Sequence, residues 1–270
     1  MRLLFFGDVV GRSGRETLCQ RLPDLRRELA LDFVLVNGEN AAGGFGITAK
    51  LCREFYDAGA DAITMGNHVW DQREIIDYID SDARLLRPEN YPLGTPGRGA
   101  AVFEAANGGK VYVVHVMLRL FMEALDDPFA AVDAALATQR LGKTVDAIIV
   151  DIHGEATSEK MALAHYVDGR ASLAAGTHTH VPTADARILP RGTGYQTDIG
   201  MCGDYDSVIG MEKEVAIRRF TRKLRDERLS AAEGEATLCA VFAETDDSTG
   251  LARRVAPLRL GGALEEAWPL

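Results

Sequence analysis

The chain has 270 residues, with 30 Lys and Arg against 40 Asp and Glu, a formal net charge of −10, and 47% hydrophobic and 26% charged residues. This composition is that of an ordinary globular protein and excludes disordered and fibrous classes. The acidic balance argues against a protein that neutralises the phosphates of a long nucleic acid, but a small phosphorylated substrate stays open because net charge does not describe a single site.

Short apolar runs alternate with amphipathic stretches through the first two thirds of the chain. In chain order, the expected strands are Leu3–Gly7, Phe33–Asn37, Ala62–Gly66, Val111–Val116, Ala147–Ile152 and Ser172–Gly176. The expected helices between them are Gly14–Leu29, Thr48–Ala58, Gln72–Ile79, Pro128–Arg140 and Ser158–Val167. The apolar runs are short and rich in β-branched and aromatic residues, which favours buried strands, and their alternation with helices predicts a layered α/β fold.

Other regions have different patterns. Ala100–Val116 contains two extended runs around Asn107-Gly108-Gly109, which predicts an antiparallel hairpin, and Pro88–Gly99 is an expected loop. The last third is expected to hold strands and one helix, at Ala184–Leu189, Thr237–Ala243, Val255–Leu260 and near Lys213–Arg225. No repeat or long linker divides the chain, so we expect residues 1–270 to form a single domain with two sheets.

The cysteines and the N-terminal segment bear on the compartment. Four scattered cysteines without a CxxC pair indicate reduced core thiols, neither a zinc knuckle nor a redox site. The apolar run Leu3–Phe6 is cut by Asp8, and no apolar stretch is long enough to cross a membrane. We therefore expect a cytoplasmic protein without a membrane partner.

Polar side chains follow five of the expected strands. They are Asp8, Glu39, Asn40, Asn67, His68, His153, His178 and His180. Taken singly, each has a structural alternative: Asp8 could cap a helix or form a turn, and a lone His153 is more often a hydrogen-bonded buried histidine. His178 and His180 give a stronger signal, because a period of two puts both imidazoles on one face of an extended segment.

Taken together, these residues favour a shared site, because the carboxyl ends of neighbouring strands meet at one edge of a sheet. Imidazole and oxygen donors without thiolates suit manganese, iron or zinc. The donors exceed what one tetrahedral ion needs, whereas two ions about 3.5–4 Å apart, bridged by Glu39, would use them all. A bridging hydroxide could then attack a phosphate, and His68, directly after Asn67, could protonate the leaving oxygen.

The ordered motifs Gly7-Asp8, Gly38-Glu39-Asn40, Gly66-Asn67-His68, His153 and Gly176–His180 resemble those of calcineurin-like metallophosphoesterases. Longer segments, among them GDVVGRSGR, NGENAAGGFGIT and TDIGMCGDYDSVIGM, resemble the bacterial YmdB-like branch. The resemblance implies a four-layer α/β sandwich of two mixed β-sheets flanked by helices, and hydrolysis of cyclic-nucleotide phosphodiester bonds.

The resemblance also implies site residues. Asp8, Glu39, Asn40 and His180 would hold one metal ion, and Glu39, Asn67, His153 and His178 would hold the other. His68 would be the proton donor. Iron is the metal that the branch implies, with manganese or zinc as alternatives.

The chain departs from the expected motifs at a few positions. Val10 stands where the superfamily has a histidine, and Glu39 where it has an aspartate; both are typical of the branch. His115 and Leu118 replace an expected asparagine and glycine, so either His115 faces the site or this loop is repacked, and repacking is favoured.

The leading hypothesis is a binuclear phosphodiesterase acting on small cyclic nucleotides, with the 2′,3′-cyclic type favoured. The alternatives are a phosphomonoesterase or nucleotidase, and a metal-containing nucleotide-binding regulatory protein without useful turnover. Arg12, Ser13 and His115 are candidate substrate contacts, although Ser13 could instead cap the following helix. A homo-oligomer is compatible with the sequence.

Overall fold

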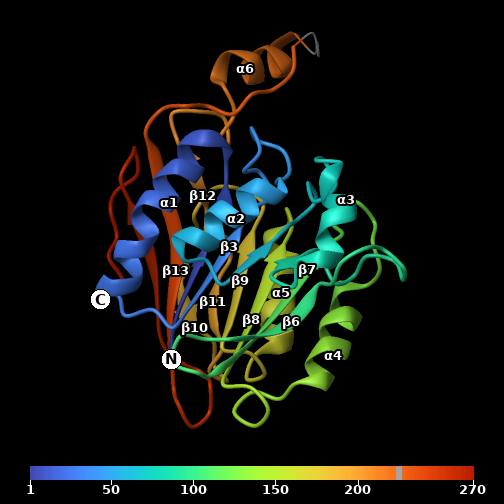
Figure 1. Ribbon diagram of the computed structural model, residues 1–270, viewed down its shortest axis with the longest axis vertical. Coiled ribbons are helices and arrows are strands. Elements are labelled where there is room, and N and C mark those ends of the chain that lie inside the picture. The colour runs from blue at the N-terminus through green and yellow to red at the C-terminus, as the bar shows by residue number, and fades with distance from the viewer. Residues whose placement is uncertain (223–226) are drawn as a thin grey trace.

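The computed structural model of the protein describes residues 1–222 and 227–270. Two mixed β-sheets pack face to face, and helices cover their outer faces (Figure 1). The first sheet contains β1 (Arg2–Phe6), β2 (Asp8–Val9), β3 (Phe33–Asn37), β4 (Ala62–Thr64), β5 (Leu85–Leu86), β12 (Met201–Asp204), β13 (Ala236–Thr245) and β14 (Ala252–Leu260). The second contains β6 (Ala100–Glu104), β7 (Lys110–Met117), β8 (Ala147–His153), β9 (Leu173–Thr177), β10 (Arg187–Ile188) and β11 (Gly194–Gln196).

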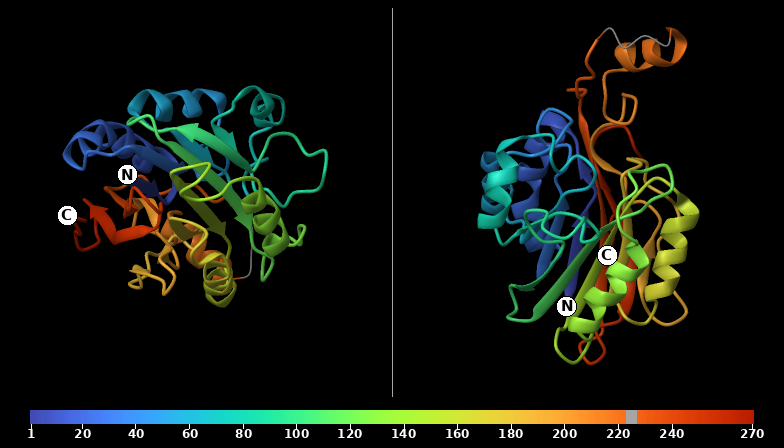
Figure 2. Two further views of the ribbon diagram at one scale, coloured as in Figure 1. Left: turned by 90° about the horizontal axis from the view of Figure 1, so that it is seen from below. Right: turned by 90° about the vertical axis from the view of Figure 1, so that its right-hand side faces the viewer.

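The helices lie in two groups on opposite sides of the sheets. They are α1 (Gly11–Glu28), α2 (Ala49–Ala58), α3 (Glu74–Tyr78), the 3₁₀ turn η1 (Ile79–Ser81), α4 (Pro128–Thr138), α5 (Thr157–Val167) and α6 (Lys213–Arg222). In the right-hand view of Figure 2, α1 and α2 lie on one side of the sandwich and α4 and α5 on the other. Helix α6 stands apart from the sandwich, at its upper end in Figure 1.

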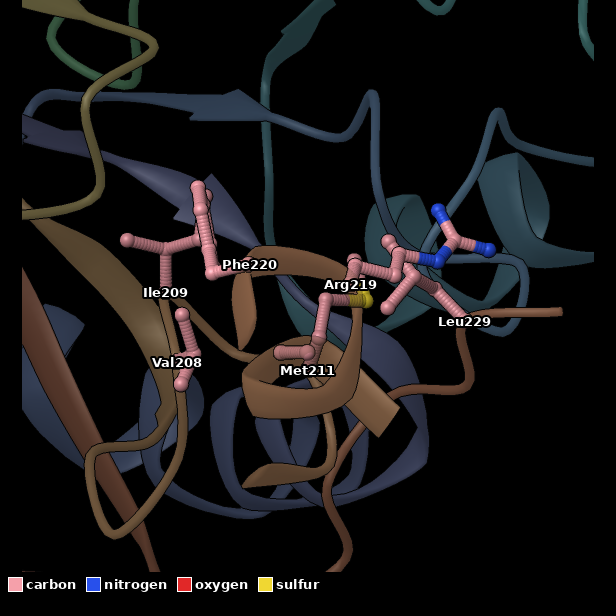
Figure 3. Close-up of a pocket in the computed structure, with 7 residues that line it drawn as sticks. Val208, Ile209, Met211, Arg219, Phe220 and Leu229 are labelled. Atoms are coloured by element: carbon pink, nitrogen blue, oxygen red, sulfur yellow. The ribbon is translucent and has the colours of Figure 1, made fainter. Parts of the chain in front are cut away.

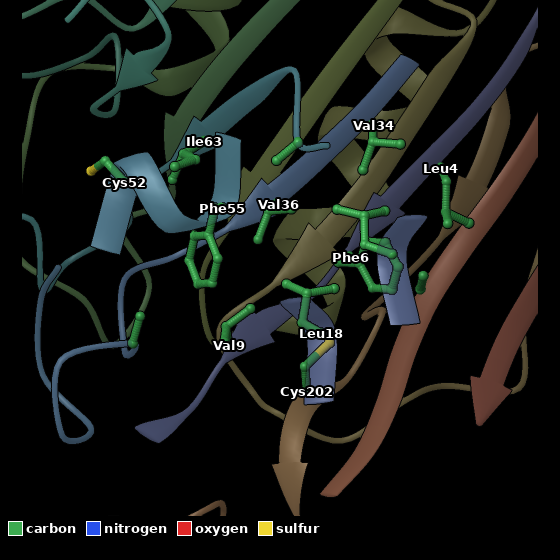
Figure 4. Close-up of a cluster of buried hydrophobic side chains, with 14 of the residues drawn as sticks. Leu4, Phe6, Val9, Leu18, Val34, Val36, Cys52, Phe55, Ile63 and Cys202 are labelled. Atoms are coloured by element: carbon green, nitrogen blue, oxygen red, sulfur yellow. The ribbon is translucent and has the colours of Figure 1, made fainter. Parts of the chain in front are cut away.

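The period-two pattern of the strands builds this layering. Along β1, Leu4 and Phe6 pack with leucines of α1 and with Phe55 of α2, in the cluster shown in Figure 4. Leu3 and Phe5 point the other way and pack against residues of β7, β8 and β9. A third cluster joins the outer face of the second sheet to α4 and α5. Apolar side chains therefore fill all three spaces between the four layers.

The direction of the strands determines at which end of the sandwich the site lies. Strands β1, β3, β4 and β5 are parallel neighbours in the first sheet, and β7, β8 and β9 are parallel neighbours in the second. Their carboxyl ends lie at the end of the sandwich from which α6 projects (Figure 1). Residues that directly follow these strands therefore meet at one end of the molecule.

Most expected elements are present with shifted ends. Helix α1 begins at Gly11, three residues early, because Gly11 has a left-handed φ of 63° and turns the chain directly from β2 into the helix. The hairpin around Asn107 is confirmed as β6 and β7. The expected helix near Lys213–Arg225 is present as α6, and residues 223–225 of that prediction lie outside the described residues.

One strand was predicted too long. Only Arg187–Ile188 of the expected strand Ala184–Leu189 pairs, because Asp185 accepts hydrogen bonds from the hydroxyls of Thr183 and Thr197, both at 2.6 Å, in place of strand pairing. The short strands β2, β5, β11 and β12 were missed, since two to four residues carry no measurable period.

Two further findings concern the cysteines and the helices. The four cysteines are free thiols, and Cys52, Cys202 and Cys239 are buried. Within residues 1–222 and 227–270, no helix has both the length and the apolar character needed to cross a membrane.

Candidate metal centre

The metal-binding candidates all lie at strand ends or a few residues beyond them. Asp8 opens β2 directly after β1, Glu39 and Asn40 follow β3, and Asn67 follows β4. From the second sheet, His153 is the last residue of β8, and His178 and His180 follow β9. The fold brings these donors from both sheets to one end of the sandwich, in the chain order expected from the sequence.

Two groups of donor atoms lie close enough to hold ions. Glu39, His153 and His178 form one group, and Asp8, Glu39 and His180 form the other, with the donor atoms of each group within 4.8 Å of one another. Asn67 joins the first group, because its Oδ1 lies 3.0 Å from Nε2 of His153. The carboxylate of Glu39 is common to both groups.

Hydrogen bonds outside the groups orient the histidines. Thr177 donates its only hydroxyl proton to Asp151 at 2.8 Å, so its oxygen must accept the bond from Nδ1 of His153, also at 2.8 Å. Nδ1 of His180 donates to the carbonyl of Ile209 at 2.7 Å. In both rings Nε2 is thereby turned toward the donor groups, as expected for a metal-binding histidine.

Gly66 makes room for one of these rings. A Cβ at this position would lie 2.2 Å from Nε2 of His153, closer than any real contact. Any side chain at residue 66 would therefore occupy the place of the His153 imidazole.

The segment of His178 and His180 is not extended, so that part of the sequence analysis was wrong. Strand β9 ends at Thr177, and the two histidines have left-handed φ values of 100° and 66°. Such conformations cost about 1–3 kcal/mol each and persist only where the surroundings hold them. Each histidine consequently belongs to a different donor group, where a strand would have presented both on one face.

A buried ion pair holds this strained segment. Nζ of Lys160 donates to the carbonyl of Thr177 at 2.8 Å and to Asp198 at 2.7 Å, and both side chains are essentially unexposed. Asp198 also accepts from the backbone N–H of Thr179 at 3.0 Å, and Asp8 accepts from that of His178 at 3.1 Å. Charge-assisted bonds on both sides thus fix the backbone between the two histidines.

The donor groups also perturb one another electrostatically. Burial alone would lower the pKa of His153, but the neighbouring carboxylates of Glu39, Asp8 and Asp151 raise it to about 9. Burial would raise the pKa of Glu39, yet His153 and His68 hold it well below its usual value. Burial also raises the pKa of Asp8 to about 6 and lowers that of His178 to about 3. Without an ion, a proton on His153 balances the carboxylates.

This balance predicts a pH dependence of metal binding. Because a ligand imidazole must be neutral, an ion has to displace the His153 proton, and metal affinity should rise from pH 6.5 to about 9. The stability of the metal-free protein should change in the opposite sense. The raised pKa of His153 stabilises the metal-free fold fully below pH 6.5, and this stabilisation is lost as the pH rises through 9. Competition with a chelator at several pH values measures the first effect, and an affinity that stays constant over this range would contradict it.

The donor set fits divalent ions. Nδ2 of Asn40 donates to the carbonyl of Gly44 at 2.9 Å, whereas its buried Oδ1 has no partner among the described residues. An unpaired buried acceptor beside two carboxylates is well satisfied by a cation. The adjoining pocket has a volume of about 260 Å³, and none of its described lining residues is Lys or Arg. An anionic substrate therefore needs a cation here.

His68 lies at the mouth of this pocket, beside the donor groups. Its backbone N–H donates to Glu39 at 3.0 Å, its Nδ1 lies 2.7 Å from Oδ2 of Asp71, and Phe45 contacts its ring edge to face. Because Asp71 binds Nδ1, Nε2 is left for a substrate. The side chain is partly exposed, as a residue that transfers protons requires.

The sequence matches the YmdB-like protein family over residues 4–258. The chain belongs to this family. A 2′,3′-cyclic-nucleotide 2′-phosphodiesterase of Bacillus subtilis (strain 168) is 48% identical over 255 residues, which cover 94% of this chain and 95% of that protein.

Two solved structures are similar to this YmdB-like chain. A hypothetical protein from Thermus thermophilus has a TM-score of 0.90 and 44% identity, covering 97% of this chain and 100% of that one. A structure described as a novel phosphatase, from Mycoplasma pneumoniae, has a TM-score of 0.88 and 34% identity, covering 97% and 93%. The predicted metallophosphoesterase sandwich, with two mixed sheets between helices, is confirmed.

The structure does not bring Arg12 and Ser13 of this YmdB-like chain to the pocket. Nε of Arg12 donates to Glu16 at 2.8 Å on the exposed side of α1. Ser13 lies inside the first turn of α1 and its hydroxyl donates to the carbonyl of Ala232, so it caps no helix. The early start of α1 explains both outcomes, since it places these residues on the helix and not in a loop over the site.

His115 does not face the pocket either. It lies within β7 and is fully buried, with Nε2 3.0 Å from the carbonyl of Met65 and Nδ1 2.9 Å from Oδ2 of Asp151. It is part of a strand, so the alternative of a repacked loop is also wrong at this position. Leu118, the other departure, is buried in the cluster under α4 and α5.

We expect His115 to matter for stability. Replacing it by Ala leaves Oδ2 of the buried Asp151 carboxylate and the Met65 carbonyl without a partner, which should lower the free energy of unfolding by about 3–5 kcal/mol. Asn should cost less, because its amide can still donate one hydrogen bond. Urea unfolding of both variants measures the difference, and equal stability of H115A and the wild type would contradict the expectation.

Sequence reasoning missed several residues around the site. Asp71 follows His68 by three residues, a spacing that could have indicated a partner. Glu155, whose carboxylate lies 3.3 Å from Nε2 of His178, follows His153 by two. Nothing in the sequence indicated that Thr177 and the apolar residues of the pocket belong to the site, because their roles depend on contacts between segments far apart in the chain.

Proposed function

We propose that the chain is a two-metal phosphodiesterase that hydrolyses small cyclic nucleotides, with 2′,3′-cyclic nucleotides as the favoured class. The observation that carries the proposal is the Glu39 carboxylate, which is common to both donor groups and accepts a bond from His68. The name of the Bacillus subtilis relative supports the substrate class. The acidic net charge argues against long nucleic acids.

The metal ligands follow from the donor groups. Asp8, Glu39, Asn40 and His180 would hold one ion, and Glu39, Asn67, His153 and His178 the other. Bound there, two ions supply Lewis-acid chemistry: they polarise the phosphate and lower the pKa of the attacking water. Mixed nitrogen and oxygen donors suit iron, the favoured metal, and also manganese and zinc.

His68 completes the reaction. The attacking water releases a proton to solvent as its oxygen forms a bond to phosphorus, and the bond from phosphorus to the ribose 2′ oxygen breaks, leaving a nucleoside 3′-phosphate. Nε2 of His68 gives its proton to the departing oxygen, while Asp71 holds Nδ1 and fixes the ring. His68 is thus the general acid.

The compartment proposed for this activity is the cytoplasm. All four cysteines are free thiols, and three are buried, as is usual in a reducing compartment.

A substrate panel tests the proposal. Protein reconstituted with iron or manganese should hydrolyse 2′,3′-cyclic AMP with a higher kcat/KM than 3′,5′-cyclic AMP and than 3′-AMP. Absence of turnover with any diester, at full metal occupancy, would overturn the proposal in favour of a binding protein.

A phosphomonoesterase is the second candidate, because the Mycoplasma pneumoniae structure is described as a phosphatase. Equal kcat/KM values for 3′-AMP and for the cyclic diester would favour it. Neither result changes the metal ligands proposed here.

A further inference from the structure

The pocket beside the donor groups has an apolar side. The apolar residues in its lining are Phe45, Ile209, Met211 and Leu229. The last three come from the segments before and after α6, so the projecting helix brings them to the site. A phosphate and its metal ions make polar contacts and gain nothing from an apolar surface. The base of a nucleoside, in contrast, is flat and largely apolar and can pack against one.

A larger hollow adjoins this side. It has a volume of about 630 Å³ and is lined chiefly by Val208, Ile209, Met211, Arg219, Phe220 and Leu229 (Figure 3). Leu229 lines this hollow, the pocket of the donor groups, and a third hollow that Arg219 and Phe45 also line. The three hollows therefore share Leu229 as a wall, and we call them together the α6 recess. The volume of the hollow in Figure 3 is in the range of small-molecule sites.

A hydrogen bond connects the recess to the metal centre. The carbonyl of Ile209 accepts the bond from Nδ1 of His180, and Ile209 itself has a left-handed φ of 49°, which is rare for a β-branched residue. Strain of this kind persists where structure and function require it. The wall of the recess and a metal-binding histidine consequently hold a fixed position relative to each other.

Arg219 supplies a polar group to the recess. Its Nη2 donates to the carbonyl of Glu227 at 2.6 Å, which anchors the guanidinium. Its Nε is buried and has no acceptor among the residues that the structure describes. A buried donor without a partner is costly, and a guanidinium matches the acceptors on the edge of a nucleobase.

We propose that the α6 recess binds the nucleobase of the substrate, and this inference rests on the proposed function. Phe45, Met211 and Leu229 pack against the base, and Nε of Arg219 donates to an acceptor on its edge. Phe45 contacts the ring of His68, so a base beside Phe45 puts its ribose at the proton donor. The recess then favours nucleotides over phosphodiesters that lack a base.

The test compares two five-membered cyclic phosphates, one with a base and one without. For the wild type, kcat/KM should be higher for 2′,3′-cyclic AMP than for glycerol 1,2-cyclic phosphate. In Leu229→Ala and Arg219→Met the ratio of the two values should fall about tenfold or more, since the loss of a buried leucine contact or of a hydrogen bond from a charged group costs about that much. Leu93→Ala makes the same chemical change at a fully exposed position on another loop and should keep the wild-type ratio.

Each outcome separates the two proposals. If the wild type hydrolyses neither cyclic phosphate, the proposed function itself fails. If it hydrolyses both and the variants keep the wild-type ratio, the base site is wrong and the proposed function stands. A second copy of the chain is the other possible occupant of the recess, and light scattering on the same variants tests for it. A changed oligomeric state with an unchanged ratio would assign the recess to that second copy.

Discussion

Replacing Glu39 by Gln should lower kcat/KM for 2′,3′-cyclic AMP by about 10³-fold or more. The carboxylate belongs to both donor groups, so its loss removes a ligand from two ions at once. Metal ions contribute several kcal/mol to a phosphoryl-transfer transition state, and each 1.36 kcal/mol is a factor of ten in rate. The amide keeps the shape of the side chain and can still accept the bond from the His68 backbone.

Metal content distinguishes the loss of a shared ligand from a general loss of structure. Elemental analysis of Glu39→Gln should find at most one ion per chain where the wild type holds two, with a cooperative thermal transition retained. Glu104→Gln makes the same chemical change at an exposed position on β6 and should retain both ions and full activity. Two ions and near wild-type turnover in Glu39→Gln would show that the carboxylate is not a shared ligand.

Replacing His68 by Ala should lower turnover about 10²–10⁴-fold while both ions stay bound. The range is that of a general acid, and His68 lies outside both donor groups. The effect should depend on the leaving group. Bis(p-nitrophenyl) phosphate expels an anion that needs no proton, so its hydrolysis should suffer at least tenfold less than that of 2′,3′-cyclic AMP.

The leaving-group dependence separates a proton donor from a structural histidine. A purely structural loss would lower both activities by the same factor. His165→Ala provides the control, because this residue lies exposed on α5 and should leave both rates unchanged. Equal losses for the two substrates in His68→Ala would assign the proton transfer to another group.

Most of the fold could be predicted from local sequence patterns. Runs such as Phe33–Asn37 are long enough for composition and period to identify a strand, and the helix from residue 49 to 58 has an N-cap at Thr48 and a glycine at its C-cap. Strands as short as β2 and β5 depend on their partners β12 and β4, which come from other parts of the chain. Tertiary pairing, and not local preference, decides those elements.

The metal-binding candidates could be predicted because each follows a strand and parallel strands end at one edge. Their surroundings could not. The left-handed backbone of His178 and His180 depends on Asp8, Lys160 and Asp198, which come from three distant segments. His115 illustrates the same limit, because only packing shows whether a histidine at the end of a strand faces a pocket or the core.

A crystal structure of the protein loaded with iron or manganese, with the ions located by anomalous scattering, tests the two-metal centre most directly. We expect two peaks about 3.5–4 Å apart with the Glu39 carboxylate between them. Asp8 and His180 should contact one ion, and His153 and His178 the other. A single ion, or a Glu39 side chain that contacts only one of two, would contradict this expectation.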